Sequence, residues 1–289
     1  MSRVRPAVSV LIPTHDRLEY LPRTLESVYA QTFGDFEVVV SDDGSTDGTA
    51  RWLRARRWPR LRVVRSVSRR GPAAARNAAL ARARGEFIAF LDSDDLWEPG
   101  YLAALCGRLR RSRAQVACSD MCTIDSAGRV IRRDFYRRNR KVRDPRFEAL
   151  SGLPFCPGLA SCVVRRAAFD EVGGFDEGFR KIHDDRDLLY RLARRYGRSG
   201  FVFVPRNLAR HRRHEDQMTG FVERGARYLP AKAALERWSE LPEPERDLIL
   251  DVVYFSAKQD CRHCDRQAGG THAHAPTPAG RSRIPARAP

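Results

Sequence analysis

Short apolar runs alternate with amphipathic stretches along the first third of the chain. Leucine and valine residues recur at helical spacing over 18–28, and a Gly-Pro pair opens an alanine-rich stretch over 73–83, so both stretches predict helices. The apolar runs predict strands at 8–12, 36–40, 61–65 and 87–91, and the five consecutive apolar residues over 87–91 suit a strand buried on both faces. This β-α-β order predicts an α/β fold with a Rossmann-like, mostly parallel central sheet flanked by helices.

Acidic residues follow two of the predicted strands at the end where open α/β sheets bind their ligands. Asp42 follows the second strand, and Asp92, Asp94 and Asp95 follow the fourth. Residues two apart in an extended chain point to the same side, so Asp92 and Asp94 can converge on one object. A divalent cation carrying a diphosphate would offset their repulsion. The alternative is an Asp-rich turn, in which Asp95 caps the next helix.

Phosphate binding by a glycine-rich loop is not predicted, because neither GxGxxG nor GxxxxGK[ST] follows any predicted strand. If phosphate is bound, metal and arginine must hold it. Ser45 or Thr46 is expected to cap the helix after the second strand.

The second half of the chain does not continue the regular β-α alternation. It predicts strands at 116–118 and 201–204, a turn at 126–128, a basic loop over 132–146, a substrate-lining segment over 155–164, a helix headed by 183–187, and helices over about 221–238 and 243–258. From residue 267 on, Gly, Thr, His, Ala, Pro and Arg dominate, which predicts disorder.

Composition excludes some classes of function. The net charge is +17, but only four of the 53 basic residues are lysines, and aromatic residues are not interleaved with the arginines, so specific nucleic-acid binding is not expected. The sequence has no apolar run of about 18 residues, and its N-terminus does not resemble a secretory signal. Seven scattered cysteines suggest reduced thiols. We therefore expect a cytoplasmic protein whose contact with a membrane, if any, is peripheral at the inner face.

Seven segments together resemble the inverting family-2 glycosyltransferases of the GT-A fold. They are VSVLIPTHDR (8–17), VVVSDDGSTDGT (38–49), GPAAARNAAL (71–80), FIAFLDSDDLW (87–97), GGFDE (173–177), HDDRDLLYRL (183–192) and HRRHEDQMT (211–219). Each segment alone is weak, but their order and spacing are specific. The resemblance implies a GT-A domain over 1–219, with a nucleotide-sugar half to about 120 and an acceptor half over 121–219. C-terminal helices over 220–264 and a tail over 265–289 would follow.

The resemblance also implies which residues bind the donor. The implied nucleotide contacts are Pro13, Thr14, Asp16, Asp42, Arg76 and Asp92. Asp42 would accept the N3–H of uracil or thymine, which favours a UDP- or dTDP-sugar. Arg76 would lie near the diphosphate, where a guanidinium suits the geometry. Asp94 and His214 would bind Mn²⁺ or Mg²⁺, with His211 as the alternative imidazole.

The implied general base is Asp185, which would take the proton from an acceptor hydroxyl. The family usually has Glu-Asp at this place, whereas this chain has Asp184-Asp185. The implied acceptor site comprises Gly174, Phe175, Asp176 and Asp184.

The expected function is therefore metal-dependent, inverting transfer of a sugar from a nucleotide-diphospho-sugar to a hydroxyl acceptor, in the synthesis of a polysaccharide, glycolipid or glycoconjugate. Two alternatives stay open. A sugar nucleotidyltransferase would need a basic phosphate-binding loop where this chain has residues 13–16. A non-catalytic basic protein that binds nucleic acid or membrane would not need the acids at strand ends.

Overall fold

A nine-stranded mixed sheet organises the residues that the computed structural model describes, which are 5–137, 144–179, 184–215 and 217. Its strand order is β3-β2-β1-β4-β8-β6-β9-β5, and β7 pairs with β6 beside this path. The strands are β1 (Val8–Thr14), β2 (Phe36–Asp43), β3 (Leu61–Ser66), β4 (Phe87–Phe90), β5 (Leu96–Trp97), β6 (Val116–Ile124), β7 (Val130–Arg132), β8 (Cys162–Arg165) and β9 (Phe201–Arg212).

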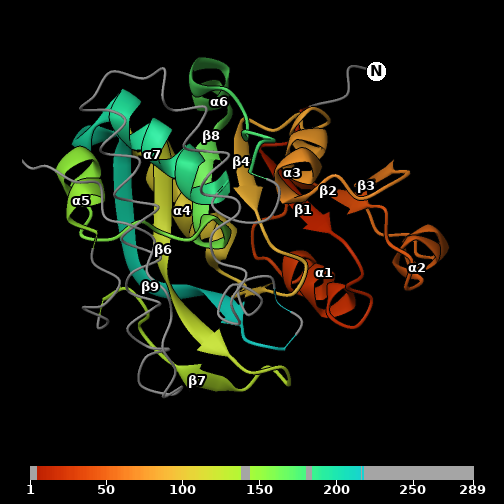
Figure 1. Ribbon diagram of the computed structural model, residues 1–289. Coiled ribbons are helices and arrows are strands. Elements are labelled where there is room, and N and C mark those ends of the chain that lie inside the picture. Colours follow the sequence, from red (N-terminus) through yellow and green to blue (C-terminus); the bar gives the residue numbers. More distant parts are fainter. Residues whose placement is uncertain (1–4, 138–143, 180–183, 216, 218–289) are drawn as a thin grey trace, which may run out of the picture. The chain divides into compact units, whose positions relative to one another are not determined.

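Helices cover both faces of the sheet (Figure 1). They are α1 (Leu21–Tyr29), α2 (Thr49–Ala55), α3 (Pro72–Leu80), α4 (Tyr101–Arg110), α5 (Pro145–Ser151), α6 (Arg166–Val172) and α7 (Asp184–Tyr196), with short 3₁₀ turns η2 (Leu159–Ser161) and η3 (Arg198–Gly200). Because side chains alternate along a strand, Val10 and Ile12 pack with α1 and α4, whereas Leu11 packs with α3, α6 and α7. Each central strand is thus buried on both faces, which explains its continuous apolar run.

The first half of the sheet is parallel, as predicted. β1 pairs parallel with both β2 and β4, and β2 pairs parallel with β3. The register sets Thr14 opposite Asp42 and Leu11 opposite Phe90. The carboxyl ends of β1, β2 and β4 therefore lie at one edge, and the four predicted strands and the three predicted helices of this half are confirmed.

The second half of the sheet corrects one interpretation of the sequence. The stretch 155–164 was expected to line the substrate, but its last residues begin β8, which lies antiparallel between β4 and β6. Cys162, Val163 and Val164 are fully buried there. Three apolar residues after a Pro- and Gly-containing stretch give too short a pattern to identify a central strand.

The other second-half predictions have different outcomes. The strands predicted at 116–118 and 201–204 are present and longer, reaching Ile124 and Arg212. The stretch 132–146 includes the end of β7 and the start of α5, and its residues 138–143 lie outside the described residues. The predicted C-terminal helices and tail also lie outside them. In the part of the chain that is described, no helix has the length and apolar character needed to cross a membrane.

Candidate active site

The parallel strands bring the predicted donor-site residues to one edge of the sheet. Pro13 and Thr14, at the end of β1, lie opposite Ser41 and Asp42 of β2. Leu91, which follows β4, donates its amide to the carbonyl of Leu11 at 3.0 Å. The turn that carries the Asp92–Asp95 carboxylates therefore begins beside the end of β1.

Asp42 is fully buried at this edge. Its Oδ1 accepts the Ser45 amide at 3.0 Å, whereas its Oδ2 lies 3.5 Å from Nε of Arg65. Among the described residues, Oδ2 and the Thr14 and Ser41 hydroxyl oxygens have no hydrogen-bond partner. The edge thus contains buried polar atoms whose bonding capacity the fold itself leaves unused, which is characteristic of a polar ligand site.

Asp16 shapes the loop beside this edge. Its backbone has φ of +48°, and its Oδ1 accepts the amides of Thr46 at 2.7 Å and Asp47 at 3.2 Å. Its own amide donates to Oγ of Ser45 at 3.0 Å. The expectation that Ser45 or Thr46 caps α2 is therefore wrong. The N-cap residue is Gly48, and no side chain makes a capping hydrogen bond there. Ser45 and Thr46 bind Asp16 instead.

Arg76 on α3 connects the donor edge to the start of α7. Its side chain is 7% exposed, its Nη2 lies 2.8 Å from Oδ1 of Asp92, and its Nη1 is ion-paired with Asp184. Burial opposes the charge of this guanidinium, but the carboxylates of Asp184, Asp92 and Asp185 outweigh it and raise the pKa of Arg76. Arg76 is thus a permanent buried cation between three carboxylates, and both of its Nη atoms are engaged by the protein.

Removing this cation should destabilise the fold. Arg76→Met is expected to lower the free energy of unfolding by about 3–5 kcal/mol, because Asp184 is left buried without its cation. Adding Asp184→Asn to the same chain should recover part of the loss. Urea unfolding of the single and double variants measures both effects, with the exposed Arg51→Met as control. A midpoint for Arg76→Met equal to that of the control would contradict the bridge.

Asp94 and Asp95 point to different partners. Oδ2 of Asp94 lies 3.0 Å from Nε2 of His214 and 3.5 Å from Nε of Arg17. Burial acts to raise the pKa of Asp94, but the His214 hydrogen bond and the nearby positive charges hold it below its usual value. Asp95 is not the predicted helix cap: it is buried, it accepts the Arg212 amide at 2.8 Å, and α4 begins only after β5.

The donor chemistry of Asp94 and His214 fits a hard divalent cation. A carboxylate oxygen and an imidazole nitrogen face each other, and such a cation can take its other ligands from diphosphate oxygens and water. Within the described ranges, no group of three or more His, Cys, Asp or Glu side chains is placed to hold a metal, so the protein alone would provide an incomplete shell. Between the two histidines, His214 lies beside Asp94, whereas Nδ1 of His211 lies 3.3 Å from Asp95.

The two acids that begin α7 occupy different environments. Asp184 is buried in its ion pair with Arg76, whereas Asp185 is half-buried and its Oδ1 accepts the Arg186 amide at 2.8 Å. Asp184 therefore lies beneath the surface in a supporting position. Asp185 is the more accessible carboxylate of the pair, next to the same buried cation.

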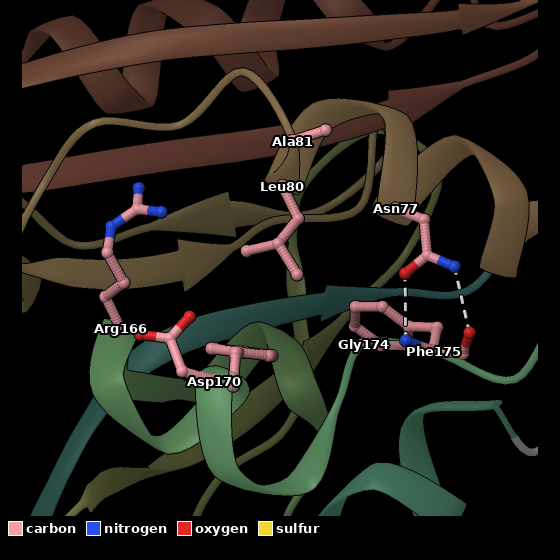
Figure 2. Close-up of a pocket in the computed structure, with 8 residues that line it drawn as sticks. Asn77, Leu80, Ala81, Arg166, Asp170, Gly174 and Phe175 are labelled. Atoms are coloured by element: carbon pink, nitrogen blue, oxygen red, sulfur yellow. Dashed lines mark hydrogen bonds between the residues drawn. The ribbon is translucent and has the colours of Figure 1, made fainter.

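The Gly174–Asp176 turn is held against α3 by Asn77 (Figure 2). The Asn77 side chain accepts the Phe175 amide at 2.8 Å and donates to the Phe175 carbonyl at 2.9 Å. A Cβ atom on Gly174 would lie 2.6 Å from Oδ1 of Asn77, which explains a glycine here. The ring of Phe175 is buried edge-on against Phe90, with centroids 5.1 Å apart, so it supports the turn from inside.

This turn also forms one wall of a pocket of about 470 Å³ between α3 and α6. The pocket is lined by Asn77, Leu80, Ala81, Arg166, Phe169, Asp170, Gly174 and Phe175. It is not lined by the carboxylates of the strand edge, so the donor-site residues and this pocket are separate features.

Sequence reasoning missed several residues that organise the site. Asn77 and Arg17 lie inside the quoted segments but were given no role, and Thr24 and Arg212 are buried next to the Asp92–Asp95 turn. The local sequence around a polar residue in a helix or strand does not show which distant residue it contacts, and the partners of Thr24 and Arg212 lie about 70 or more residues away.

Comparison with known proteins identifies relatives of this chain. A family model described as "Glycosyl transferase family 2" matches residues 9–173, more than half of the chain. The succinoglycan biosynthesis protein ExoO of Rhizobium meliloti (strain 1021) is 36% identical over 127 residues, which cover 44% of this chain and 36% of that protein. The chain thus matches little more than a third of this relative's length.

Two solved structures share the fold. TarS 1–349 of S. aureus in complex with UDP-GlcNAc superposes with a TM-score of 0.64 and 23% identity, covering 86% of this chain and 71% of the TarS 1–349 chain. The mannosyltransferase PcManGT of Pyrobaculum calidifontis, in complex with GDP-Man and Mn²⁺, has a TM-score of 0.59 and 21% identity, covering 94% and 77% of the two chains. The sheet and its flanking helices therefore form a GT-A fold.

Proposed function

The chain belongs to glycosyl transferase family 2, and we propose that it is a metal-dependent, inverting glycosyltransferase that uses a UDP- or dTDP-sugar. The observation that carries this proposal is a pair of charged clusters that share one turn: Asp94 pairs with His214, and Asp92, two residues before it, pairs with Arg76, which also binds Asp184 at the start of α7. Arg76 would thereby connect the donor phosphate site, through Asp92, with Asp184, the residue before the candidate base.

The nucleotide would bind along the strand edge at Pro13, Thr14, Asp16 and Asp42. Oδ1 of Asp42 is occupied by the Ser45 amide, so Oδ2 is the atom left to accept a ring N–H. Arg65 lies over Oδ2 with a side chain 49% exposed, and its movement would open this carboxylate to a base. Uracil and thymine have the required N3–H, whereas cytosine does not.

This arrangement predicts the effect of Asp42→Asn. The Asn carbonyl is expected to take the Ser45 amide, which places an NH₂ group where Oδ2 now lies. UDP binding should weaken by about 10- to 100-fold, as for loss of one hydrogen bond to a charged group, and the preference for UDP over CDP should shrink or reverse. Calorimetric titration with both nucleotides measures this, with the exposed Asp35→Asn as control. An unchanged ratio of the two affinities would remove Asp42 from base recognition.

The cation would be held by Asp94 and His214, with Asp92 reaching the ribose or the hydrated metal. The Mn²⁺ in the PcManGT complex supports a divalent metal in this fold. When bound, Mn²⁺ or Mg²⁺ supplies positive charge against the negative charge of the nucleoside diphosphate. Arg17, 3.5 Å from Asp94, adds a second positive group at the same place.

Transfer would proceed by one displacement. Asp185 takes the proton of an acceptor hydroxyl while the hydroxyl oxygen bonds to the anomeric carbon. The bond from that carbon to the diphosphate oxygen breaks, and the nucleoside diphosphate leaves with the electron pair. A single displacement inverts the anomeric configuration. Asp184 would support the site from the interior through its ion pair with Arg76. Gly174, Phe175 and Asp176 would shape the acceptor side.

The names of the relatives support a proposal for the acceptor class. ExoO is named for succinoglycan biosynthesis, and we extend this to a role for the present chain in polysaccharide or glycoconjugate synthesis on the cytoplasmic side of the membrane. The chain's net charge of +17 would favour a peripheral contact with an anionic membrane surface.

Nucleotide binding tests the donor half directly. Calorimetric titrations with UDP, dTDP, GDP and CDP, each with and without Mn²⁺, should give metal-dependent binding of UDP or dTDP. Preference for GDP would keep the transferase and overturn the role of Asp42. Failure of all four nucleotides to bind would overturn the proposed reaction.

A further inference from the structure

Arg212 is the largest side chain that the described part of the fold buries almost completely. It is the last residue of β9, two positions before His214. Its Nε donates to the carbonyl of Asp94 at 2.7 Å, and its backbone amide donates to Oδ1 of Asp95 at 2.8 Å. Arg212 therefore binds both the backbone and a side chain of the turn that carries the proposed metal ligand.

The same guanidinium extends to the turn between β6 and β7. Its Nη1 donates to the carbonyls of Ser126 at 2.7 Å and Asp125 at 3.1 Å. Its Cζ lies 5.2 Å from the ring centroid of Tyr20, and that ring lies 4.6 Å from the ring of His214. The Arg212 side chain thus contacts the Asp94 turn, the β6–β7 turn and the ring of Tyr20, which lies beside the ring of His214.

The turn around Asp94 is held from two sides. Oγ1 of Thr24 lies 3.0 Å from the Ser93 carbonyl and 2.9 Å from the Asp95 carbonyl, while Arg212 takes the Asp94 carbonyl between them. Three successive carbonyl groups are therefore within hydrogen-bond distance of buried side chains. The backbone is held in this way at the position from which the Asp94 carboxylate faces His214 and Arg17.

The bonds of Arg212 explain the residue type. Its guanidinium hydrogen bonds go to backbone carbonyls on two sides, from Nε to the Asp94 turn and from Nη1 to the β6–β7 turn, while Nη2 is buried without a hydrogen-bond partner among the described residues. A lysine ammonium is a single point of charge and cannot reach both turns together. Burying a guanidinium mainly against carbonyls has a cost in solvation, and burial lowers the pKa of Arg212. Because burial of this guanidinium is unfavourable, its presence indicates that it serves to hold the two turns in a fixed geometry.

We propose that Arg212 is a positioning residue for the divalent cation, acting by holding the Asp94 turn against the β6–β7 turn. This inference rests on the proposed function for its metal, but the holding of the turn is a property of the metal-free protein. Groups outside the first coordination shell typically change metal affinity by about 10- to 100-fold when replaced. We expect a loss in this range for Arg212→Lys.

The test uses the full chain and two readouts. The first is hydrogen exchange of the metal-free protein, followed by mass spectrometry over the peptides that contain 92–97 and 124–128. The second is Mn²⁺ affinity in the presence of UDP, measured from free Mn²⁺ by electron paramagnetic resonance. Arg210→Lys is the matched control, because Arg210 lies on the same strand and pairs with Glu98 away from the turn. Thr24→Val is a second test variant that removes the other holder of the turn without changing charge.

Faster exchange confined to these two segments, together with Mn²⁺ affinity weakened by about 10- to 100-fold in Arg212→Lys and not in Arg210→Lys, would support the proposal. Unchanged exchange in both segments, or unchanged Mn²⁺ affinity in a folded Arg212→Lys, would overturn it. If Arg212→Lys does not fold, Thr24→Val, which of the two turns contacts only the Asp94 turn, must speed exchange over 92–97 and weaken Mn²⁺ binding, and no change in either would overturn the proposal. If the wild type binds no Mn²⁺, the proposed function fails, and hydrogen exchange still decides whether Arg212 holds the turn.

Discussion

Asp94→Asn is expected to abolish metal-dependent nucleotide binding while leaving the fold intact. The amide can keep a hydrogen bond with His214, but it removes the negative charge that a divalent cation requires. Turnover of the nucleotide-sugar should fall by about 10³-fold or more, because the cation's stabilisation of the leaving group is worth several kcal/mol. Calorimetric titration with UDP and Mn²⁺ measures the binding, and release of UDP measures the turnover.

Asp35→Asn is the control for this variant, because Asp35 is an exposed acid. It should bind UDP and Mn²⁺ like the wild type. If Asp94→Asn retained metal-dependent binding within a few-fold of the wild type, Asp94 would not be the metal ligand, and the Asp94–His214 pair would have only a structural role.

Asp185→Asn is expected to give the opposite pattern, in which binding survives and transfer is lost. In the part of the chain that the structure describes, Asp185 binds the Arg186 amide and lies next to the buried Arg76 cation, apart from the Asp94–His214 pair. Its neutralisation should therefore leave UDP–Mn²⁺ affinity within about 3-fold, a difference below 1 kcal/mol. The rate of transfer should drop by about 10²- to 10⁴-fold, the usual contribution of a general base.

Asp184→Asn separates the base from its support. Asp184 is buried and ion-paired, so its replacement should mainly lower stability and disturb Arg76, whereas Asp185→Asn should unfold close to the wild type. Equal rates of transfer by Asp185→Asn and wild type would assign the base to another residue, and the first acid to examine would then be Asp184.

The parallel half of the sheet was predictable because its central strands β1, β2 and β4 are buried, so that most of their residues are apolar. Val8–Ile12 and Phe87–Leu91 are examples, and the acids that follow such runs were correctly placed at one edge because parallel register leaves no other choice. The family resemblance added residue roles, and the family itself is confirmed by the match over 9–173. The individual roles stay predictions.

The rest depended on contacts between distant segments, which a local pattern does not encode. β8 is short and follows a Pro- and Gly-containing stretch, so its insertion between β4 and β6 has no periodic signal. Asp95 looked like a cap because the sequence does not show that β5 separates it from α4. Arg212 stands among other arginines in a basic segment, and only the fold shows that it is buried while Arg213 is exposed.

The most direct test of the central claim is the anomeric outcome of donor turnover. The protein is incubated with Mn²⁺ and a panel of UDP- and dTDP-α-sugars, with sugar alcohols as acceptors, and the first product is read by proton NMR. We predict release of the nucleoside diphosphate from at least one donor and a β-linked product, both lost in Asp94→Asn and Asp185→Asn. An α-linked product, or turnover that is the same in wild type and both variants, would contradict the account.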